Sequence, residues 1–239
     1  MATVGSSARR SGATASASGK GRKRKAVPWS SVADYRFRFS VERFLAPTGE
    51  PDEYILTIDG AILWEPEDAA SPVIVGETKA VVIQAGRACN DSVSLCDVCD
   101  CHSQEALDAY TLLYDEETLK EAVSEGGWHD ALILSRALVL PEHRGNRLGQ
   151  LALLRQIEDF GNQVGVAACK PFPLQHEAHR EGREDPYKLA DFARDGDHGM
   201  KRLRRYWGEL GFEQIGTSDW FSMDLAYERP TFGDFVSQR

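Results

Sequence analysis

The spacing of apolar and polar positions predicts a mixed α/β protein built around one sheet. Strands are expected where β-branched and aromatic residues alternate or cluster, and helices where apolar residues recur every three or four positions. The expected strands are 35–45, 54–64, 73–85, 131–140, 164–169, 212–215 and 220–227. Helices are expected within 91–127 and at 148–160 and 200–210. Because strands alternate with helices in the second half of the chain, we expect a twisted, mixed sheet flanked by helices.

Two of these elements carry much of the expected core. The segment Ala131–Leu140 is almost continuously apolar, which is typical of a strand covered on both faces. The helix that follows it places Leu151, Leu154, Ile157 and Phe160 on one side, which indicates a buried face. No apolar run reaches the length of a membrane span, and the first residues lack the apolar core of a secretion signal. We therefore expect a cytoplasmic protein that does not enter a membrane.

The first 30 residues differ in composition from the rest of the chain. Residues 1–30 are mostly Ser, Ala, Gly and basic residues, and we expect them to be a disordered basic tail. The whole chain has a net charge of -9, so the remainder is strongly acidic. That balance argues against a broad nucleic-acid surface and fits a cationic partner such as an amine. Nucleic acid is a candidate partner only through the tail, whose basic run is Lys20–Lys25.

The most informative stretch joins the strand at 131–140 to the helix at 148–160. The strand breaks at Pro141, a basic turn follows, and Gly145 and Gly149 lie where the helix begins. The first turn of a helix has backbone N–H groups without partners and a partial positive charge. Arg144 and Arg147 add full charges, and guanidinium groups bind phosphate well. The segment therefore predicts a site for a phosphate-bearing ligand.

Three features in the second half of the chain together resemble one family. RGNRLG (Arg144–Gly149) lies between strand and helix, a second buried strand follows at 164–169, and YWGELGF (Tyr206–Phe212) ends a helix before the next strand. This arrangement resembles the GNAT N-acetyltransferase superfamily over roughly Ala131–Tyr227. The resemblance implies a splayed mixed sheet and a single GNAT-like domain over 31–239, with a charged insert at about 174–198.

The resemblance also implies acetyl-CoA as co-substrate. The turn and the helix start would bind the pyrophosphate, and the preceding strand would pair with the pantetheine arm. A bulge near that strand would splay the sheet and leave a slot for the thioester. The implied cofactor-binding residues are Leu138, Val139, Leu140, Arg144, Gly145, Asn146, Arg147, Leu148, Gly149 and Gln150.

The implied reaction is direct transfer of an acetyl group to the amine of a small molecule or a protein. A backbone N–H near Val139 or Leu140 is the expected oxyanion donor. Glu142 and Tyr206 are the catalytic candidates, and acids and histidines of the insert, such as His176, Glu177 and His179, are further candidates for the base.

The chain departs from the family pattern at three points. Arg147 replaces the middle glycine of the motif, which is compatible with the motif if the residue has helical φ. Trp207, rather than a tyrosine, lies five residues before Phe212, and Tyr206 lies about 100° around the helix from it. Three strands precede the first helical segment, whereas the family usually has two helices after its first strand.

Other interpretations remain open at this point. One is a non-catalytic acyl-CoA-binding sensor or scaffold of the same fold, and another is a nucleic-acid-associated protein that uses the basic tail. Cys96, Cys99 and Cys101 have a spacing at which zinc can bind, but the paired Cys-x-x-Cys units of zinc sites are missing, so we expect free thiols and no metal. The two histidines of His176-x-x-His179 fit a solvated charged surface better than a metal site. A homodimer is neither indicated nor excluded.

Overall fold

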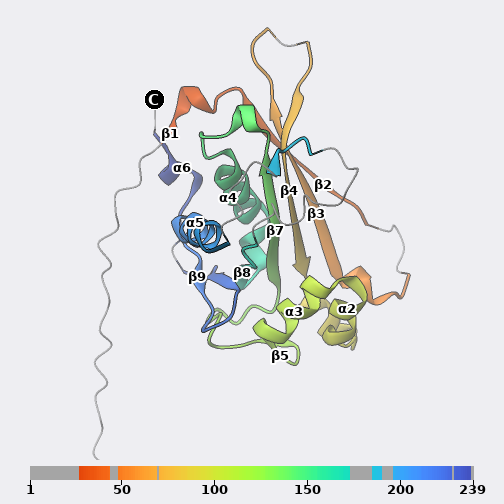
Figure 1. The fold of residues 1–239 in the computed structure, drawn as a ribbon. Coiled ribbons are helices and arrows are strands. Elements are labelled where there is room, and N and C mark those ends of the chain that lie inside the picture. The colour runs from red at the N-terminus through yellow and green to blue at the C-terminus, as the bar shows by residue number, and fades with distance from the viewer. Residues whose placement is uncertain are drawn as a thin grey trace, which may run out of the picture.

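The computed structural model describes residues 27–43, 48–68, 70–172, 185–189, 196–227 and 229–237. In this part of the chain, seven strands form one mixed sheet in the order β2-β3-β4-β7-β8-β10-β9 (Figure 1). The strands are β2 (Tyr35–Val41), β3 (Ile55–Trp64), β4 (Val73–Ile83), β7 (Ala131–Val139), β8 (Val166–Cys169), β9 (Glu213–Gln214) and β10 (Phe221–Asp224). Among the neighbours in this sheet, β7 and β8 are parallel, and the other pairs are antiparallel.

The helices cover both faces of the sheet. Those described are α1 (Ala85–Asn90), α2 (Leu95–His102), α3 (Gln104–Leu113), α4 (Leu148–Phe160), α5 (Gly196–Glu209) and α6 (Phe232–Phe235). The short 3-10 helices are η1 (Trp29–Ser31), η2 (Pro51–Tyr54), η3 (Pro141–His143) and η4 (Gly161–Gln163). Two small pairs lie outside the main sheet, namely β1 (Val27–Pro28) with β11 (Val236–Ser237), and β5 (Tyr114–Asp115) with β6 (Thr118–Leu119).

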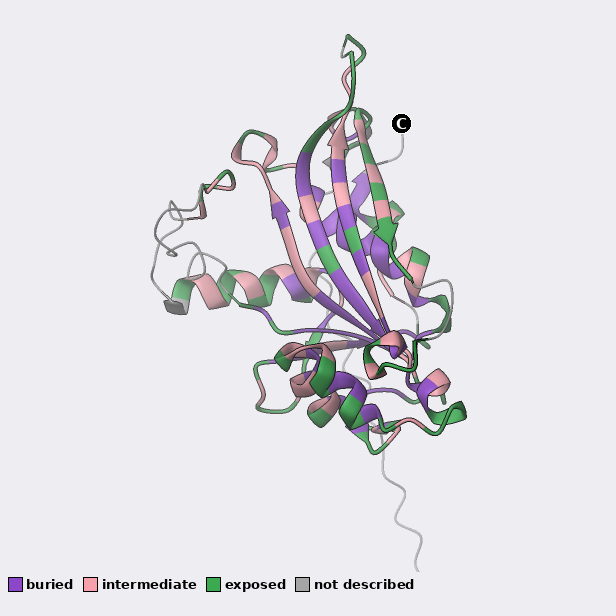
Figure 2. Ribbon diagram, turned by 90° about the vertical axis from the view of Figure 1, so that its right-hand side faces the viewer, coloured by how far each residue is buried: buried purple, intermediate pink, exposed green. Residues whose placement is uncertain are grey.

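The alternation of side chains along β7 divides the core into two layers. Leu132 and Leu134 pack with α4 and α5, whereas Ala131 and Ile133 point to the opposite face and pack with α2 and α3. Both layers are buried at this end of the strand, which explains why its sequence is continuously apolar. α2 and α3 gather at one end of their face, and the rest of that face is left open (Figure 2).

The fold class expected from the sequence is confirmed as a mixed α/β protein. The helix 148–160 has the expected bounds, and the helical region 91–127 contains two helices and the β5–β6 hairpin. Ser103 accounts for the break between the two helices, because its backbone ends α2 and its hydroxyl accepts the N–H of Ala106 at the start of α3. α1, α6 and the β1–β11 pair were not expected. Among the described residues, no helix combines the length and apolar character that crossing a membrane requires.

The expected tail at 1–30 lies almost wholly outside the described residues, as does most of the insert at 174–198, including His176, Glu177 and His179. As expected from the sequence, three strands of the main sheet precede the first α-helix of the described residues. Between β2 and β3, the described residues form the 3-10 helix η2 and no α-helix, whereas α1, α2 and α3 follow β4.

Candidate functional site

The sheet opens between its two parallel strands. β7 pairs with β8 at Ala131, Leu132 and Ile133, and beyond them β7 pairs with β4 alone among the described strands. The register between β4 and β7 shifts so that Lys79 faces Arg136 while Ala80 faces Leu134, which leaves Ser135 as the extra residue of a β-bulge. A bulge increases the local bend of a strand, and among the described strands the far half of β7 has a neighbour on one side only. A bulge was expected closer to Leu138–Leu140, and it lies a few residues earlier.

The turn after β7 leads into a helix start without a side-chain cap. Gly145 has φ 98° and Arg147 has φ 56°, so both lie in the left-handed region. The condition of a helical φ, on which Arg147 would be compatible with the motif, is therefore not met, since this position adopts the conformation that favours glycine. The N–H of Leu151 donates to the carbonyl of Arg147, and no side chain caps α4. The N–H groups that precede Leu151 in the first turn have no acceptor within the helix, which is the geometry of an anion site.

The two arginines of this turn make contacts within the protein. Arg144 donates from Nε to the carbonyl of Val139 at 2.9 Å, and its Nη2 donates to the carbonyl of Tyr187. Arg147 lies 3.6 Å from Glu209 of α5, and its guanidinium carbon is 5.6 Å from the centre of the Phe235 ring. Both side chains thus brace the turn, and direct contacts to an anion would come chiefly from backbone N–H groups.

The last residues of β7 differ in what they present to the open edge. The N–H of Leu140 donates to the carbonyl of Val75 on β4, so it is not available as an oxyanion donor. Because successive N–H groups of an extended strand point to opposite edges, the N–H of Val139 points to the open edge. Leu138 is buried, and its neighbours Ala137 and Val139 face the start of α4. Of the two oxyanion donors expected from the sequence, the structure favours Val139.

Tyr206 of α5 points at the start of α4. Its hydroxyl lies 2.8 Å from the position that a Cβ on Gly149 would take, and Ala137 and Val139 lie 3.8 Å from that position. Burial, and secondarily Cys169 at the end of β8, raises the pKa of the Tyr206 phenol well above its ordinary value. No hydrogen bond to this hydroxyl is found among the described residues. Tyr206 therefore presents a protonated phenol beside the opening.

Trp207, the neighbour of Tyr206, belongs to the core. It is 6% exposed and packs edge-on against Phe212 and Tyr206. Gln150 of α4 fixes this part of α5, because its Nε2 donates to the carbonyl of Tyr206 at 3.1 Å. The tyrosine one position earlier than the family pattern is thus the one that faces the opening.

A carboxylate that the sequence analysis did not single out lies on the other side of the opening. Ser135, the bulged residue, donates its hydroxyl to Glu105 of α3 at 2.7 Å. Glu105 is half-buried and has no ion-pair partner among the described residues. Its charge contributes, after burial, to a strongly raised pKa of the Cys169 thiol. Glu105 on α3 and Tyr206 on α5 belong to helices that pack on opposite faces of the sheet.

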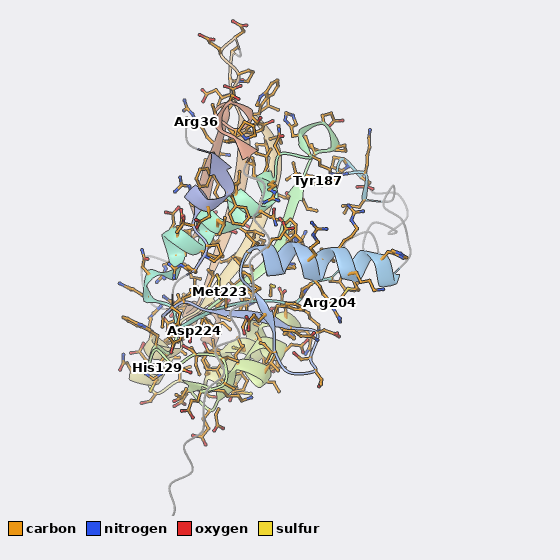
Figure 3. All side chains as sticks on the ribbon, turned by 90° about the vertical axis from the view of Figure 1, so that its left-hand side faces the viewer. Arg36, His129, Tyr187, Arg204, Met223 and Asp224 are labelled. Atoms are coloured by element: carbon orange, nitrogen blue, oxygen red, sulfur yellow. The ribbon has the colours of Figure 1, made fainter. Side chains whose placement is uncertain are left out.

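Glu142, the other catalytic candidate, is exposed in the 3-10 helix η3. Its neighbour His143 is bound to the hydroxyl of Tyr35 at 2.8 Å, on the side of β2. No contact of Glu142 with Ser135, Glu105 or Tyr206 is found in the described residues, so its role stays a prediction. Tyr187 lies beside the turn after β7, and Arg204 projects from the outer side of α5 (Figure 3).

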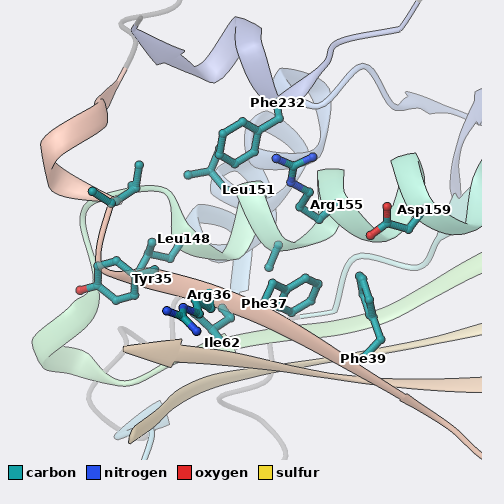
Figure 4. Close-up of a pocket in the computed structure, with 13 residues that line it drawn as sticks. Tyr35, Arg36, Phe37, Phe39, Ile62, Leu148, Leu151, Arg155, Asp159 and Phe232 are labelled. Atoms are coloured by element: carbon teal, nitrogen blue, oxygen red, sulfur yellow. The ribbon is translucent and has the colours of Figure 1, made fainter. Parts of the chain in front are cut away.

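A cavity of about 510 Å³ lies between β2 and α4 (Figure 4). Its walls are mostly apolar and include Phe37, Phe39, Leu151 and Phe232. Its charged lining residues are Arg36, Arg155 and Asp159, and of these Arg155 is held over the Phe232 ring at 4.4 Å and pairs with Glu158 at 2.8 Å.

The cysteines are the remaining candidates for metal binding. Cys89, Cys96 and Cys101 are exposed and Cys99 is buried, and all are free thiols. Burial raises the pKa of Cys99 to about 12, which disfavours the thiolate that a metal needs. Within the described part of the chain, no group of three or more His, Cys, Asp or Glu side chains is placed to hold a metal ion. No family model matches the chain, and neither curated proteins nor solved structures yielded a match.

Proposed function

We propose that this protein is an N-acyltransferase of the GNAT type that transfers an acetyl group from acetyl-CoA directly to an amine. The observation that carries the proposal is the position of the Tyr206 hydroxyl. It lies at the start of α4 and beside the open edge of β7, where an anion site and an opened sheet meet.

The sheet supports a GNAT-type arrangement in its second half. The pairing of the parallel strands β7 and β8 ends at Ile133, and the resemblance to the family implies an opening at this place. The turn and the uncapped start of α4 follow directly, so one segment offers an open strand edge and an anion site in sequence. A pantetheine arm carries two amides and can pair with such an edge as an added strand. The first half differs from the usual pattern, because α2 and α3 follow β4.

The residues at the opening supply an acid and a base. The Glu105 carboxylate takes a proton from the attacking ammonium group, and the amine nitrogen then bonds to the thioester carbonyl carbon. The N–H of Val139 points to the open edge and stabilises the negative charge on the carbonyl oxygen. As the carbon–sulfur bond breaks, Tyr206 donates its proton to the leaving sulfur, and the nitrogen of the new amide gives its second excess proton to the Tyr206 phenolate. The products are the amide and free CoA, and Glu105 returns its proton to solvent.

The positions of acid and base suit a direct transfer. Glu105 belongs to α3 and Tyr206 belongs to α5, so they act from opposite faces of the sheet on a group held between β7 and β8. The raised pKa of Tyr206 keeps the phenol protonated at neutral pH, as an acid requires. Partial burial of Tyr206 disfavours the charged phenolate, so the neutral phenol is the stable form before the reaction.

The proposal is tested by release of free CoA from acetyl-CoA over a panel of primary amines, with a thiol reagent as the readout. We expect amine-dependent release that exceeds the rate of hydrolysis. Saturable binding of acetyl-CoA without release for any amine would instead support the non-catalytic sensor or scaffold. That alternative is argued from Trp207, because an indole cannot act as an acid at the position where the family often has a tyrosine. Absence of both binding and release would contradict the proposal.

A further inference from the structure

The open face of the sheet carries a charged hollow next to the proposed site. α2 and α3 cover the end of this face near the β7–β8 pairing, and β2, β3, β4 and the far half of β7 continue beyond them (Figure 2). The hollow has a volume of about 430 Å³ and includes Arg38, Asp59, Glu77, Lys79 and Arg136 in its lining. Its size fits a small molecule better than a protein segment.

Two positive charges of the hollow lie next to each other in the sheet. Lys79 of β4 and Arg136 of β7 are directly opposite in the strand register, and Asp59 of β3 is opposite Lys79 on its other side. Like charges at such positions destabilise a sheet. No ion pair or hydrogen bond of Lys79 or Arg136 with another described residue is found. Both cationic side chains are therefore open to a bound anion.

Two acidic residues of the lining lie beside this pair. Burial, and then the charge of Glu77, raises the pKa of the Tyr187 phenol to about 12. Asp59 is exposed and lies opposite Lys79 in the register of β3 and β4, but no ion pair between them is found in the described residues. Burial, and then the charge of Lys79, lowers the pKa of His102 on α2.

The hollow adjoins the residues that would carry the reaction. Arg136 follows the bulged residue Ser135, whose hydroxyl binds Glu105. An anionic group between Lys79 and Arg136 would thus place the other end of a short molecule near the Glu105 carboxylate. The Glu105 carboxylate favours an ammonium group at this second end of the bound molecule.

We propose that this hollow is the acceptor subsite and that the acceptor is a small amine that also carries a carboxylate or phosphate group. The inference rests on the proposed acyl transfer for its function, but the binding of the anion is a separate property. Lys79, Arg136 and Arg38 bind the acid group, and the amine lies toward Glu105.

Calorimetry with the full-length protein tests the inference through three probes: ethanolamine, O-phosphoethanolamine and β-alanine. We expect at least one of the two acidic amines to bind about tenfold or more tightly than ethanolamine, since hydrogen bonds to charged groups contribute that much. If phosphate is the natural group, O-phosphoethanolamine binds more tightly than β-alanine, and the reverse order indicates a carboxylate. Equal, weak binding of all three would overturn the inference.

Substitutions in the hollow test whether Lys79 and Arg136 cause the preference for acidic amines. Lys79→Gln and Arg136→Gln should each remove most of the preference for acidic amines, whereas Arg43→Gln, an exposed arginine outside the hollow, should retain it. Arg136→Gln should also raise the Tm by about 1–3 °C, because it relieves the like-charge pair and keeps Lys79 opposite Asp59. Weaker anion binding together with a higher Tm distinguishes a binding role from a structural one. A preference unchanged in both hollow variants would overturn the inference.

A parallel titration with acetyl-CoA separates the two proposals. If acetyl-CoA binds and the acidic amines do not, the acceptor inference fails and the proposed function stands. If the acidic amines bind in a Lys79-dependent manner and acetyl-CoA does not, the proposed function fails and the anion site stands.

Discussion

The hydroxyl of Tyr206 lies 2.8 Å from the place where a Cβ on Gly149 would be. This relationship joins α5 to the first turn of α4, at the point where β7 has lost β8 as a neighbour. It explains why glycine is present in the first turn of α4, although alanine favours a helix by about 0.5–1 kcal/mol. The account of function depends on this contact.

Gly149→Ala should therefore displace the Tyr206 hydroxyl without unfolding the protein, because the clash is with the far end of a side chain. We expect kcat to fall by about tenfold or more, since small displacements of reacting groups are costly. The matched control is Gly208→Ala on α5, whose added Cβ has nothing within 4 Å. Equal rates in the two variants, measured by CoA release, would argue against a role for this contact.

Tyr206→Phe keeps the ring against Trp207 and removes the proposed acid. We expect kcat to fall on the order of 10²-fold with little change in KM, as is typical of a lost general acid. The acid works while protonated, and burial raises the pKa of Tyr206. Wild-type activity should therefore not decline, through this group, until the pH exceeds the ordinary tyrosine pKa of about 10. A decline near neutral pH that disappears in Tyr206→Phe would contradict this assignment.

Glu105→Gln preserves the size of the side chain and removes the proposed base. We expect kcat at neutral pH to fall on the order of 10²-fold. Part of this loss should be recovered at higher pH, where more of the amine is already deprotonated. Glu121→Gln, which neutralises an exposed acid that has no hydrogen bond to Ser135, is the control. A rate and pH profile equal to those of the control would exclude Glu105 as the base.

The left-handed conformation of Arg147 predicts a specific order of stability between two variants. Arg147→Ala and Arg147→Gly both lose the contacts with Glu209 and Phe235, but glycine also relieves the backbone strain. Arg147→Gly should thus be more stable than Arg147→Ala by about 1 kcal/mol. Urea denaturation measures the difference, and a more stable alanine variant would show that the turn is not left-handed in solution.

The periodicity of the sequence was sufficient to predict the elements that bury one clear face. The helix α4 was predictable from the spacing of Leu151, Leu154 and Ile157. The strand β7 was predictable from its continuous apolar run, which indicates a strand covered on both faces. The break at Ser103 was not predicted, because it depends on a serine that ends one helix and caps the next.

The candidate site was predictable only where its parts are consecutive in the chain. The turn and the start of α4 follow β7 directly, so one segment was enough to indicate an anion site. Glu105 could not be found in this way, since it meets Ser135 through packing of α3 on the sheet and lies 30 residues away. Counting back from Phe212 led to Trp207, and the structure shows that Tyr206 is the side chain turned toward Gly149. Which side of α5 faces the sheet depends on tertiary packing, which a spacing rule does not include.

The central claim is that the start of α4 and the opened edge of β7 bind acetyl-CoA, and calorimetry tests it most directly. We predict saturable, one-to-one binding of acetyl-CoA to the wild-type protein. Gly149→Glu should bind at least about 100-fold more weakly while remaining folded by circular dichroism, because it adds a carboxylate at the anion site. Absence of binding to the wild type, or unchanged affinity in a folded Gly149→Glu variant, would contradict the account.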